Sequence, residues 1–495
     1  MFPLIDPRSV IRLFWLIVFS GSIPLEGLAQ PRTVSGWHAQ LEGGGWLANG
    51  PVHAFWLQAN QYGSVPPTVP AATLRADVWK TYSPPDTTAF RGRFDWCTGL
   101  QLVGNLTDNP QLLLPVIYAK LRWKDLELSA GRWRQLTGLG DSTLSSGFIN
   151  GSNNALPIPK IQLGTLGYVP LRFTQRWLAV NAGYGHGWFM NTYIQGSYLH
   201  QKYFYLRGGK PTSRLKVYLG LNHQVQWGGQ ADYLKGSPVA IDGKLPSAFS
   251  YYPDIVLGLR PREWSTPGYT NFDGAYWFGN GLGSEDIGAE LATSMGTWLL
   301  YHQHIYDDYS GLVWQNLPDG LTGLSWHRAG GAGRHWLNRV VVEYLSTMDQ
   351  SGASFDLSSA YQGEDNYFNH SQYREGWSYR GRTIGTPFIM PQADVQPGAR
   401  GGQFFPNNRL KMGYLGASGQ LGTGLDWFLR LSYSQNYGAY SSPYPTSFGQ
   451  LSALINLQWQ LPTLANTRLT ASVAIDQGAL LPNTLGSFIG LRKNW

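Results

Sequence analysis

The chain has 495 residues and a formal net charge of +7, but only 14% of its residues are charged, against roughly 25% in an average soluble domain. Aromatic residues also make up 14% of the chain, which excludes intrinsic disorder because disordered chains are poor in aromatics. The mean hydropathy is −0.23, and no apolar run of about 20 residues follows the N-terminal region, which excludes a bundle of membrane-spanning helices. The composition indicates a β-rich chain with an aromatic, charge-poor surface.

The N-terminus has the parts of a secretory signal. Arg8 and Arg12 supply its positive charge, residues 13–19 are apolar, and residues 27–29 (Gly-Leu-Ala) place small side chains at a cleavage site. The apolar run is too short to span a bilayer as a helix. The alternative, a buried N-terminal helix, is disfavoured because Pro24 would break it. The region is therefore predicted to direct export.

We expect residues 1–29 to be removed as a signal peptide and residues 30–495 to form the mature protein. No linker or shift in composition divides this region, so a single domain is predicted. Cys97 is the lone cysteine and cannot form a disulfide within the chain. The fold therefore needs another source of stability, and a closed hydrogen-bond network would supply it.

Apolar and polar residues alternate along much of the chain. From Arg214 to Trp227, for example, leucines and valines on one side alternate with Lys216, Tyr218 and Asn222 on the other. Successive side chains of a strand point to opposite faces of a sheet, so each such segment is predicted to be a strand with one apolar and one polar face. The same pattern occurs in residues 117–124, 425–434, 451–461 and 468–476.

Strands of this kind suit a soluble sandwich or a membrane barrel. The segments run for about 9–14 residues, longer than in most soluble sheets and long enough for a tilted bilayer crossing. Their polar faces are too charged for a dry core, and in lipid the sheet must close to satisfy its backbone. We therefore predict an all-β, antiparallel transmembrane barrel of the outer-membrane type, ending in an aromatic strand at Trp495. A girdle of aromatic side chains is expected at Trp123, Trp227, Tyr433 and Trp459.

The connections between strands are of two kinds. Short turns such as 462–466 are expected on the periplasmic side, and long connections outside the cell. The long segments are rich in glycine and proline, and loops of this length are usually functional or disordered. They cover residues 61–72, 140–160, 228–270, 350–372 and 383–408.

Several distinctive motifs follow one another along essentially the whole mature chain. They include residues 129–132 (SAGR), 153–161 (NNALPIPKI), 186–189 (HGWF), 198–202 (YLHQK), 220–229 (GLNHQVQWGG), 376–382 (GWSYRGR) and 384–388 (IGTPF). Taken in this order, the motifs resemble the Wzi family of capsule assembly proteins, particularly its Bacteroidetes branch.

The resemblance implies a barrel of about eighteen strands that acts as a surface lectin and retains capsular polysaccharide. Enterobacterial members also carry a periplasmic helical bundle. Here residues 37–41 and 53–57 alternate as strands do, which puts such a bundle in doubt.

Sugar recognition uses flat rings that stack on C–H groups and planar polar side chains that bind hydroxyls. Candidate carbohydrate-binding residues of these types occur in the motifs and long segments. The alternative for each is a structural role in fixing loop geometry or in the aromatic girdle. The candidates are Asn153, Asn154, Trp188, His200, Lys202, Asn369, Tyr373, Trp377, Arg380 and Arg382.

No catalytic motif for a hydrolase or nucleotide-binding enzyme is present, so no enzyme activity and no cofactor are expected. His302 and His304 share a strand face with Asp307 and Asp308 close by, but no third ligand of known geometry is evident, so lumen-lining histidines are expected and no metal site is predicted.

The function predicted from the sequence is carbohydrate binding at the cell outer membrane, with retention or assembly of capsular or exopolysaccharide. The net positive charge would help to attract an acidic polymer. Expected partners are that polysaccharide, outer-membrane lipid and lipopolysaccharide, and the barrel-assembly machinery during insertion. No nucleic acid is expected, and the protein is expected to be a monomer. The alternatives are an outer-membrane channel for small solutes or oligosaccharides and, with least support, an outer-membrane hydrolase.

Overall fold

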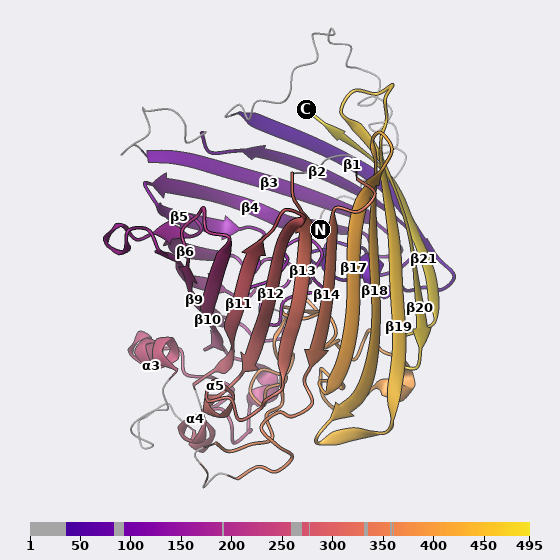
Figure 1. The fold of residues 1–495 in the computed structure, drawn as a ribbon. Coiled ribbons are helices and arrows are strands. Elements are labelled where there is room, and N and C mark those ends of the chain that lie inside the picture. Colours follow the sequence, from indigo (N-terminus) through magenta and orange to yellow (C-terminus); the bar gives the residue numbers. More distant parts are fainter. Residues whose placement is uncertain are drawn as a thin grey trace, which may run out of the picture.

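In the described part of the chain, eighteen crossings form one closed antiparallel β-barrel (Figure 1). The sheet closes where the first strand pairs with the last, from Gln40 opposite Asn494 to Ala48 opposite Gly486. This confirms the predicted fold class. The expected signal peptide lies outside the described residues. The computed structural model describes residues 36–83, 94–190, 193–258, 270–276, 278–330, 335–356, 359 and 361–495.

Each crossing is one strand, except that β6 and β7 share the crossing beside β8. A further hairpin, β15 (Ser378–Tyr379) with β16 (Arg382–Thr383), lies apart from the barrel sheet. The barrel strands are β1 Trp37–Ala48, β2 Ala71–Lys80, β3 Phe94–Leu106, β4 Gln111–Trp123, β5 Leu126–Arg132, β6 Lys160–Thr165, β7 Val169–Pro170, β8 Leu178–Trp188, β9 Tyr198–Gly208, β10 Leu215–Trp227, β11 Asn280–Ala292, β12 Gly296–Tyr306, β13 Gly320–Arg328, β14 Arg339–Ser346, β17 Leu410–Leu421, β18 Leu425–Ala439, β19 Ser442–Gln460, β20 Thr467–Gly478 and β21 Thr484–Asn494.

The two ends of the barrel differ. One, here called the terminal end, carries the start of β1 and the finish of β21. The other, called the long-loop end, carries the long connections 49–70, 133–159, 228–279 and 347–409. The described helices are short, and none is long and apolar enough to cross a membrane. They are α2 Phe55–Gln58, η2 Arg172–Thr174, η3 Asp232–Leu234, η4 Phe249–Tyr251, α3 Tyr252–Leu257, α4 Asn271–Ala275, α5 Tyr309–Leu312 and η5 Pro397–Ala399.

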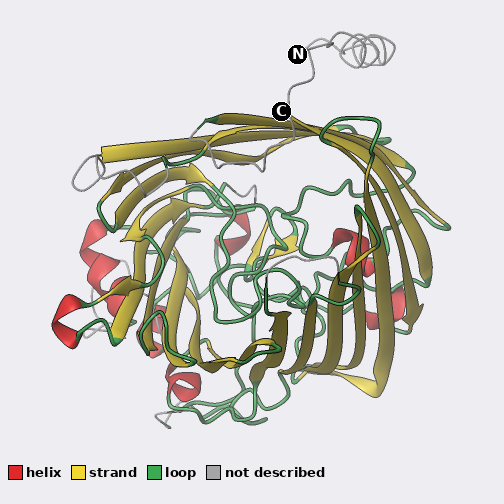
Figure 2. Ribbon diagram, turned by 45° about the horizontal axis from the view of Figure 1, so that its top comes forward, coloured by secondary structure: helices red, strands yellow, loops and turns green. Residues whose placement is uncertain are grey.

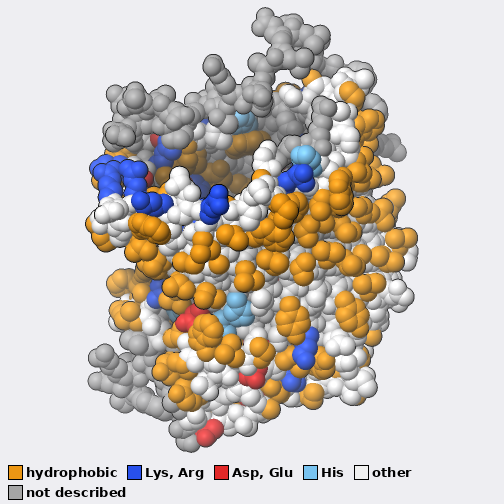
Figure 3. Space-filling view, in the orientation of Figure 1, with side chains coloured by type: hydrophobic (Ala, Val, Ile, Leu, Met, Phe, Trp, Pro, Cys, Tyr) orange, Lys and Arg blue, Asp and Glu red, His pale blue; other side chains and the backbone are white. Residues whose placement is uncertain are grey.

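The apolar row of each strand covers the outside of the barrel, as the alternation predicts. In β10, Leu215 and Leu219 are each 56% exposed, whereas Tyr218 and Asn222 belong to the alternate row, face the lumen and are buried. Figure 3 shows the resulting belt of hydrophobic side chains around the visible face. On β18, Phe428 and Arg430 lie on the same row as the buried Ser432 and therefore face inward.

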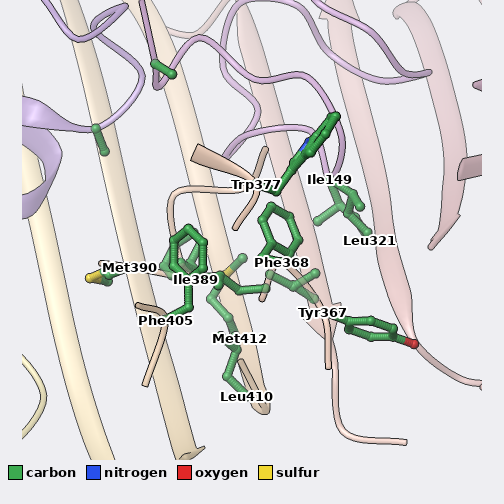
Figure 4. Close-up of a cluster of buried hydrophobic side chains, with 14 of the residues drawn as sticks. Ile149, Leu321, Tyr367, Phe368, Trp377, Ile389, Met390, Phe405, Leu410 and Met412 are labelled. Carbon is green, nitrogen blue, oxygen red and sulfur yellow. The ribbon is translucent and has the colours of Figure 1, made fainter. Parts of the chain in front are cut away.

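The chain itself fills the lumen toward the long-loop end. Nearer the terminal end a cavity of about 490 Å³ remains, lined by Glu42, Arg75 and Arg134 among others. Connections from the long-loop end fold into the barrel (Figure 2), and their apolar side chains pack against inward residues of the strands (Figure 4). Trp56 is fully buried there, and its Nε1 donates a hydrogen bond to Ser432 Oγ of β18 at 3.0 Å. We call this cluster the plug core; it includes Phe55, Trp56, Leu144, Ile149, Leu321, Val341, Tyr367, Phe368, Trp377, Phe388, Ile389, Phe405, Leu410, Met412 and Tyr414.

Two sequence-based expectations are wrong. Residues 37–41 form a strand as expected, but residues 53–57 do not, because their end lies in helix α2. Phe55, Trp56 and Leu57 are all buried, so apolar surroundings on every side replace the two-faced environment of a strand. Trp227 is also not part of an exposed girdle. It lies on the outer face of β10 but is buried, with the ring of Tyr252 from α3 5.6 Å away.

Candidate functional site

Two adjoining cavities lie among connections 228–279 and 347–409 at the long-loop end. The larger has a volume of about 620 Å³ and the smaller about 350 Å³. Both are lined by Asn366, Asn369, His370 and Ser371, so we treat them as one site and call it the loop cleft. Connection 347–409 supplies side chains to both cavities, and β11 and the segment after β12 supply part of the smaller one.

The larger cavity combines a flat ring with planar polar groups. The guanidinium carbon of Arg374 lies 5.0 Å from the centre of the Tyr233 ring, a cation–π arrangement. The Tyr233 hydroxyl donates to the carbonyl oxygen of Gln372 at 2.8 Å, which holds the ring in place. Gln392 and Gln403 add amide groups to the lining. This combination can stack on a sugar ring and bind its hydroxyls.

The smaller cavity has a row of aromatic rings on its lining. The ring centres of Phe272 and Tyr276 are 4.5 Å apart, and Phe355 stacks on Tyr276 at 6.0 Å with an angle of 22° between the planes. His370 meets Phe272 edge-on at 5.9 Å. Burial lowers the pKa of His370 to about 4, so the imidazole is neutral at neutral pH. The row therefore offers apolar faces and a neutral hydrogen-bonding ring.

Two buried donors on the same lining have no protein partner. Asn280 is 4% exposed and Trp377 is 1% exposed, yet neither Asn280 Nδ2 nor Trp377 Nε1 makes a hydrogen bond among the described residues. Both residues line the smaller cavity. A buried donor without a partner is costly, so such groups usually meet water or a ligand.

Polar contacts hold the wall formed by connection 347–409. Asn369 Nδ2 donates to Gln403 Oε1 at 2.9 Å and to the carbonyl oxygen of Phe405 at 3.0 Å. The backbone N–H of Phe405 returns a hydrogen bond to Asn369 Oδ1 at 3.1 Å. The carboxamide of Asn369 is therefore engaged with protein groups, and its geometry suits positioning the cleft.

The structure brings together some of the candidate binding residues predicted from the sequence. Asn369 and Trp377 both line the loop cleft. Tyr373 lies behind it, fully buried, with its hydroxyl donating to the carbonyl oxygen of Gly228 at 3.2 Å. Tyr373 thus links the two connections that form the cleft.

A second group of predicted residues lies elsewhere inside the barrel. Asn154 and Arg382 line a separate cavity of about 70 Å³. Arg382 forms an ion pair with Asp394 at 2.8 Å, and Asn154 Nδ2 donates to the carbonyl oxygen of Thr383 at 3.0 Å. Arg380 is exposed in the turn between β15 and β16.

Asn153 is adjacent to this group in the chain. It is half-buried, and its carbonyl oxygen accepts a hydrogen bond from the backbone N–H of Tyr62. Asn153, Asn154 and Arg382 therefore contact the connections that fold into the barrel.

A third group lies on the outer face of the barrel. Trp188 is partly exposed at the end of β8. His200 is fully buried, and its Nδ1 meets the Tyr252 hydroxyl of α3 at 3.3 Å. The Lys202 ammonium donates to the carbonyl oxygen of Val256. The structure therefore separates Trp188, His200 and Lys202 from the loop cleft.

The sequence analysis missed most of the cleft lining, including Tyr233, Phe272, Tyr276, Asn280, Phe355, Asp365 and Arg374. The sequence pointed to Asp307 and Asp308 only as neighbours of His302 and His304, in a metal site that was not predicted. Those histidines do share a face, with ring centres 6.1 Å apart. The expectation that they line the lumen is wrong. His302 pairs with Thr322 on the outer row, while the inward row of β12 contains Gln303.

Comparisons with known proteins agree on the fold. No family model matches the sequence, and no curated protein matches it. Among solved structures, the chain is similar to Wzi, described as an outer membrane protein involved in group 1 capsule assembly in Escherichia coli and a carbohydrate-binding β-barrel, with 15% identity, 91% of this chain and 83% of that chain covered, and a TM-score of 0.53.

Similarity extends to other barrels. For OccK5 (OpdH) of Pseudomonas aeruginosa, the identity is 10%, the coverage 93% and 98%, and the TM-score 0.45. For OccAB2 of Acinetobacter baumannii, the values are 10%, 94% and 99%, and 0.47. At 15% identity, the similarity to Wzi shows a shared outer-membrane β-barrel fold and a distant structural relationship.

Proposed function

We propose that this protein is a non-enzymatic lectin of the outer membrane that retains capsular or exopolysaccharide at the cell surface, and that the loop cleft is its binding site. If the loop cleft binds polysaccharide at the cell surface, the long-loop end faces outward and the terminal end faces the periplasm. An apolar belt on the barrel exterior supports residence in a membrane. The description of the Wzi barrel as carbohydrate-binding adds support from a distant structural relative.

The observation that carries the proposal is the position of the loop cleft on top of a packed interior. Phe368 and Trp377 line the smaller cavity and also belong to the plug core. The cleft is thus a depression with an apolar floor and with aromatic, amide and guanidinium groups on its walls. Such a site can hold a polymer segment at the long-loop end.

The packed interior also favours a lectin over the alternative of a solute channel. Close-packed apolar side chains leave few voids larger than a water molecule. Here they join the connections to the inward faces of β13, β14 and β17 through Leu321, Val341 and Met412. We expect purified protein in a planar bilayer to give no steady single-channel current. Large, stable conductance steps would favour the channel.

Binding to purified surface polysaccharide from the producing cell tests the site. Arg374→Ala and Phe355→Ala remove exposed groups from the two cavities and are expected to weaken binding by about tenfold each, roughly 1.4 kcal/mol. Matched controls are Arg214→Ala and Phe173→Ala, which remove exposed side chains of the same two types at the terminal end. Equal weakening by the controls, or none by the cleft variants, would contradict the assignment.

The cellular role is tested by deletion. Without the protein, cell-bound polysaccharide is expected to fall while shed polysaccharide rises and total synthesis stays constant. Unchanged retention at unchanged synthesis would defeat the proposed role, and turnover of the polysaccharide by purified protein would instead indicate a hydrolase.

A further inference from the structure

Three carboxylates meet on the lining of the smaller cavity. Asp307 and Asp308 directly follow β12, and Asp365 comes from connection 347–409. One oxygen atom of each lies within 4.8 Å of those of the other two. Calcium binds oxygen at about 2.3–2.6 Å, so two ligands of one ion lie at most about 5 Å apart. The three oxygen atoms are thus spaced as ligands of a single ion.

Neighbouring hydroxyls orient two of these carboxylates. Ser310 donates through both its backbone N–H and its Oγ to Asp308 Oδ1, at 2.7 Å each. Ser351 Oγ donates to Asp365 Oδ2 at 2.7 Å. Metal sites commonly use such outer hydrogen bonds to orient their ligands.

A fourth carboxylate, that of Asp319, lies outside the cluster and fixes the segment that supplies Ser351. It accepts hydrogen bonds from the backbone N–H groups of Met348, Asp349 and Gln350 at 2.7–3.1 Å. The carbonyl oxygen of Gln350 in turn accepts from the backbone N–H of Asp365 at 2.9 Å. The third ligand is therefore held against the other two by the fold.

The electrostatics of the cluster require a positive partner or bound protons. No described lysine or arginine forms an ion pair with Asp307 or Asp365. Asp307 Oδ1 is buried without a hydrogen-bond partner among the described residues. A bound divalent cation would neutralise these charges.

Independent evidence for a ligand comes from the two unpartnered donors described above. Asn280 and Trp377 are buried, line the same cavity as the three aspartates, and have N–H groups that meet no acceptor among the residues that the structure describes. A cation alone leaves these donors unsatisfied. A saccharide oxygen can accept from them while neighbouring hydroxyls complete the coordination of the ion.

We propose that Asp307, Asp308 and Asp365 bind a divalent cation, Ca²⁺, which joins the protein to vicinal hydroxyls or a carboxylate of the saccharide in the smaller cavity. The cation site stands on its own geometry; its bridging role rests on the proposed lectin function. Oxygen ligands from carboxylates and hydroxyls are those that Ca²⁺ prefers. A bridging cation also lets an acidic cavity accept an acidic polymer.

Calorimetric titration of CaCl₂ into chelator-treated full-length protein in detergent, without saccharide, tests the cation site. One ion is expected to bind, and Asp307→Asn and Asp365→Asn are each expected to weaken its affinity by about tenfold or more. Asp307→Asn keeps the shape of the side chain and loses no hydrogen bond made by Oδ1. It therefore still tests the cation site if the Asp365→Asn variant fails to fold. Asp242→Asn, an exposed carboxylate of connection 228–279 that lines neither cavity, is the matched control.

Binding of the surface polysaccharide in CaCl₂ and in EDTA then tests the bridge. We expect at least about tenfold weaker binding in EDTA for wild type, and no such difference for Asp307→Asn. Absence of Ca²⁺ binding to wild type, or equal binding by all variants, would overturn the cation site whatever the polysaccharide does. Ca²⁺ binding with calcium-independent saccharide binding would overturn the bridge. Ca²⁺ binding with no saccharide binding under either condition would instead count against the lectin function.

Discussion

Gln372 donates a hydrogen bond to Asp273 with 2.8 Å between Nε2 and Oδ1, and both side chains are buried. The same amide donates to the carbonyl oxygen of Val239 at 2.9 Å. These contacts tie connection 347–409 to connection 228–279 beside the loop cleft. The partners are 99 residues apart in sequence, so the cleft depends on long-range contacts that no local pattern encodes.

Replacing Gln372 with alanine is expected to loosen this junction. The change leaves a buried carboxylate oxygen and a carbonyl without their donor, which costs about 1–3 kcal/mol. Amide hydrogen exchange in residues 231–245 should quicken, and polysaccharide binding should weaken. Gln111→Ala, at an exposed position on β4, is the control and should change neither. Unaltered exchange in the Gln372 variant would show that the two connections are held in some other way.

Trp56→Ala tests the plug core. The ring contacts Phe388 and Tyr414 with ring centres 5.8 Å and 5.4 Å away, and its Nε1 binds Ser432. Removing a fully buried tryptophan costs about 3–5 kcal/mol. The midpoint temperature of thermal unfolding should drop. It is measured as the temperature at which the barrel shifts from its folded to its unfolded mobility on electrophoresis. Trp37→Ala, at an exposed outer position, should have little effect.

Glu42→Gln tests the seam where the barrel closes. Glu42 is buried on β1 and accepts from Arg75 of β2 at 2.8 Å and from Arg492 of β21 at 2.6 Å. Removing the carboxylate leaves two arginines facing each other, which we expect to cost about 3 kcal/mol. Glu290→Gln breaks the more exposed pair with Lys216 and should cost less than about 1 kcal/mol. Equal denaturation midpoints for the two variants would contradict this difference.

Acid should weaken the packing of connection 49–70. Burial, and then Arg382, lower the pKa of His53 from 6.5 to about 4, although Asp394 and Asp476 line the same cavity. Between about pH 4 and pH 6.5 the unfolded chain binds more protons at His53 than the folded chain does. The stabilising contribution of the neutral His53 is therefore full above pH 6.5 and is lost as the pH falls toward 4. The stability advantage of wild type over His53→Gln should therefore shrink between pH 7 and pH 4.5. An advantage that grows on acidification would contradict the assignment.

The barrel could be predicted from sequence because its two environments alternate with the side-chain period of a strand. Leu219 faces outward and Tyr218 inward for the reason that the pattern indicates. Residues 53–57 show the same pattern, but Phe55 and Trp56 lie in the plug core and Leu57 in a second buried cluster. Because apolar groups surround these side chains, their alternation does not indicate a strand with two different faces.

The loop cleft could be predicted only in part. Asn369 and Trp377 belong to a recognisable motif region, whereas Asp365 meets Asp307 only after the long connection folds back onto β12. His200 and Lys202 are of the right chemical types, but α3 covers them on the outer face. Residue type indicates what a side chain can bind, and tertiary contacts decide whether it is free to do so.

The most direct measurement is an experimental structure of the full-length protein with an oligosaccharide prepared from the polysaccharide of the producing cell. We expect density for the sugar in the loop cleft, against Tyr233 and Arg374 in one cavity or Phe355 and Trp377 in the other. Density on the outer face around His200, in the lumen at the terminal end, or nowhere at saturating concentration would contradict this expectation.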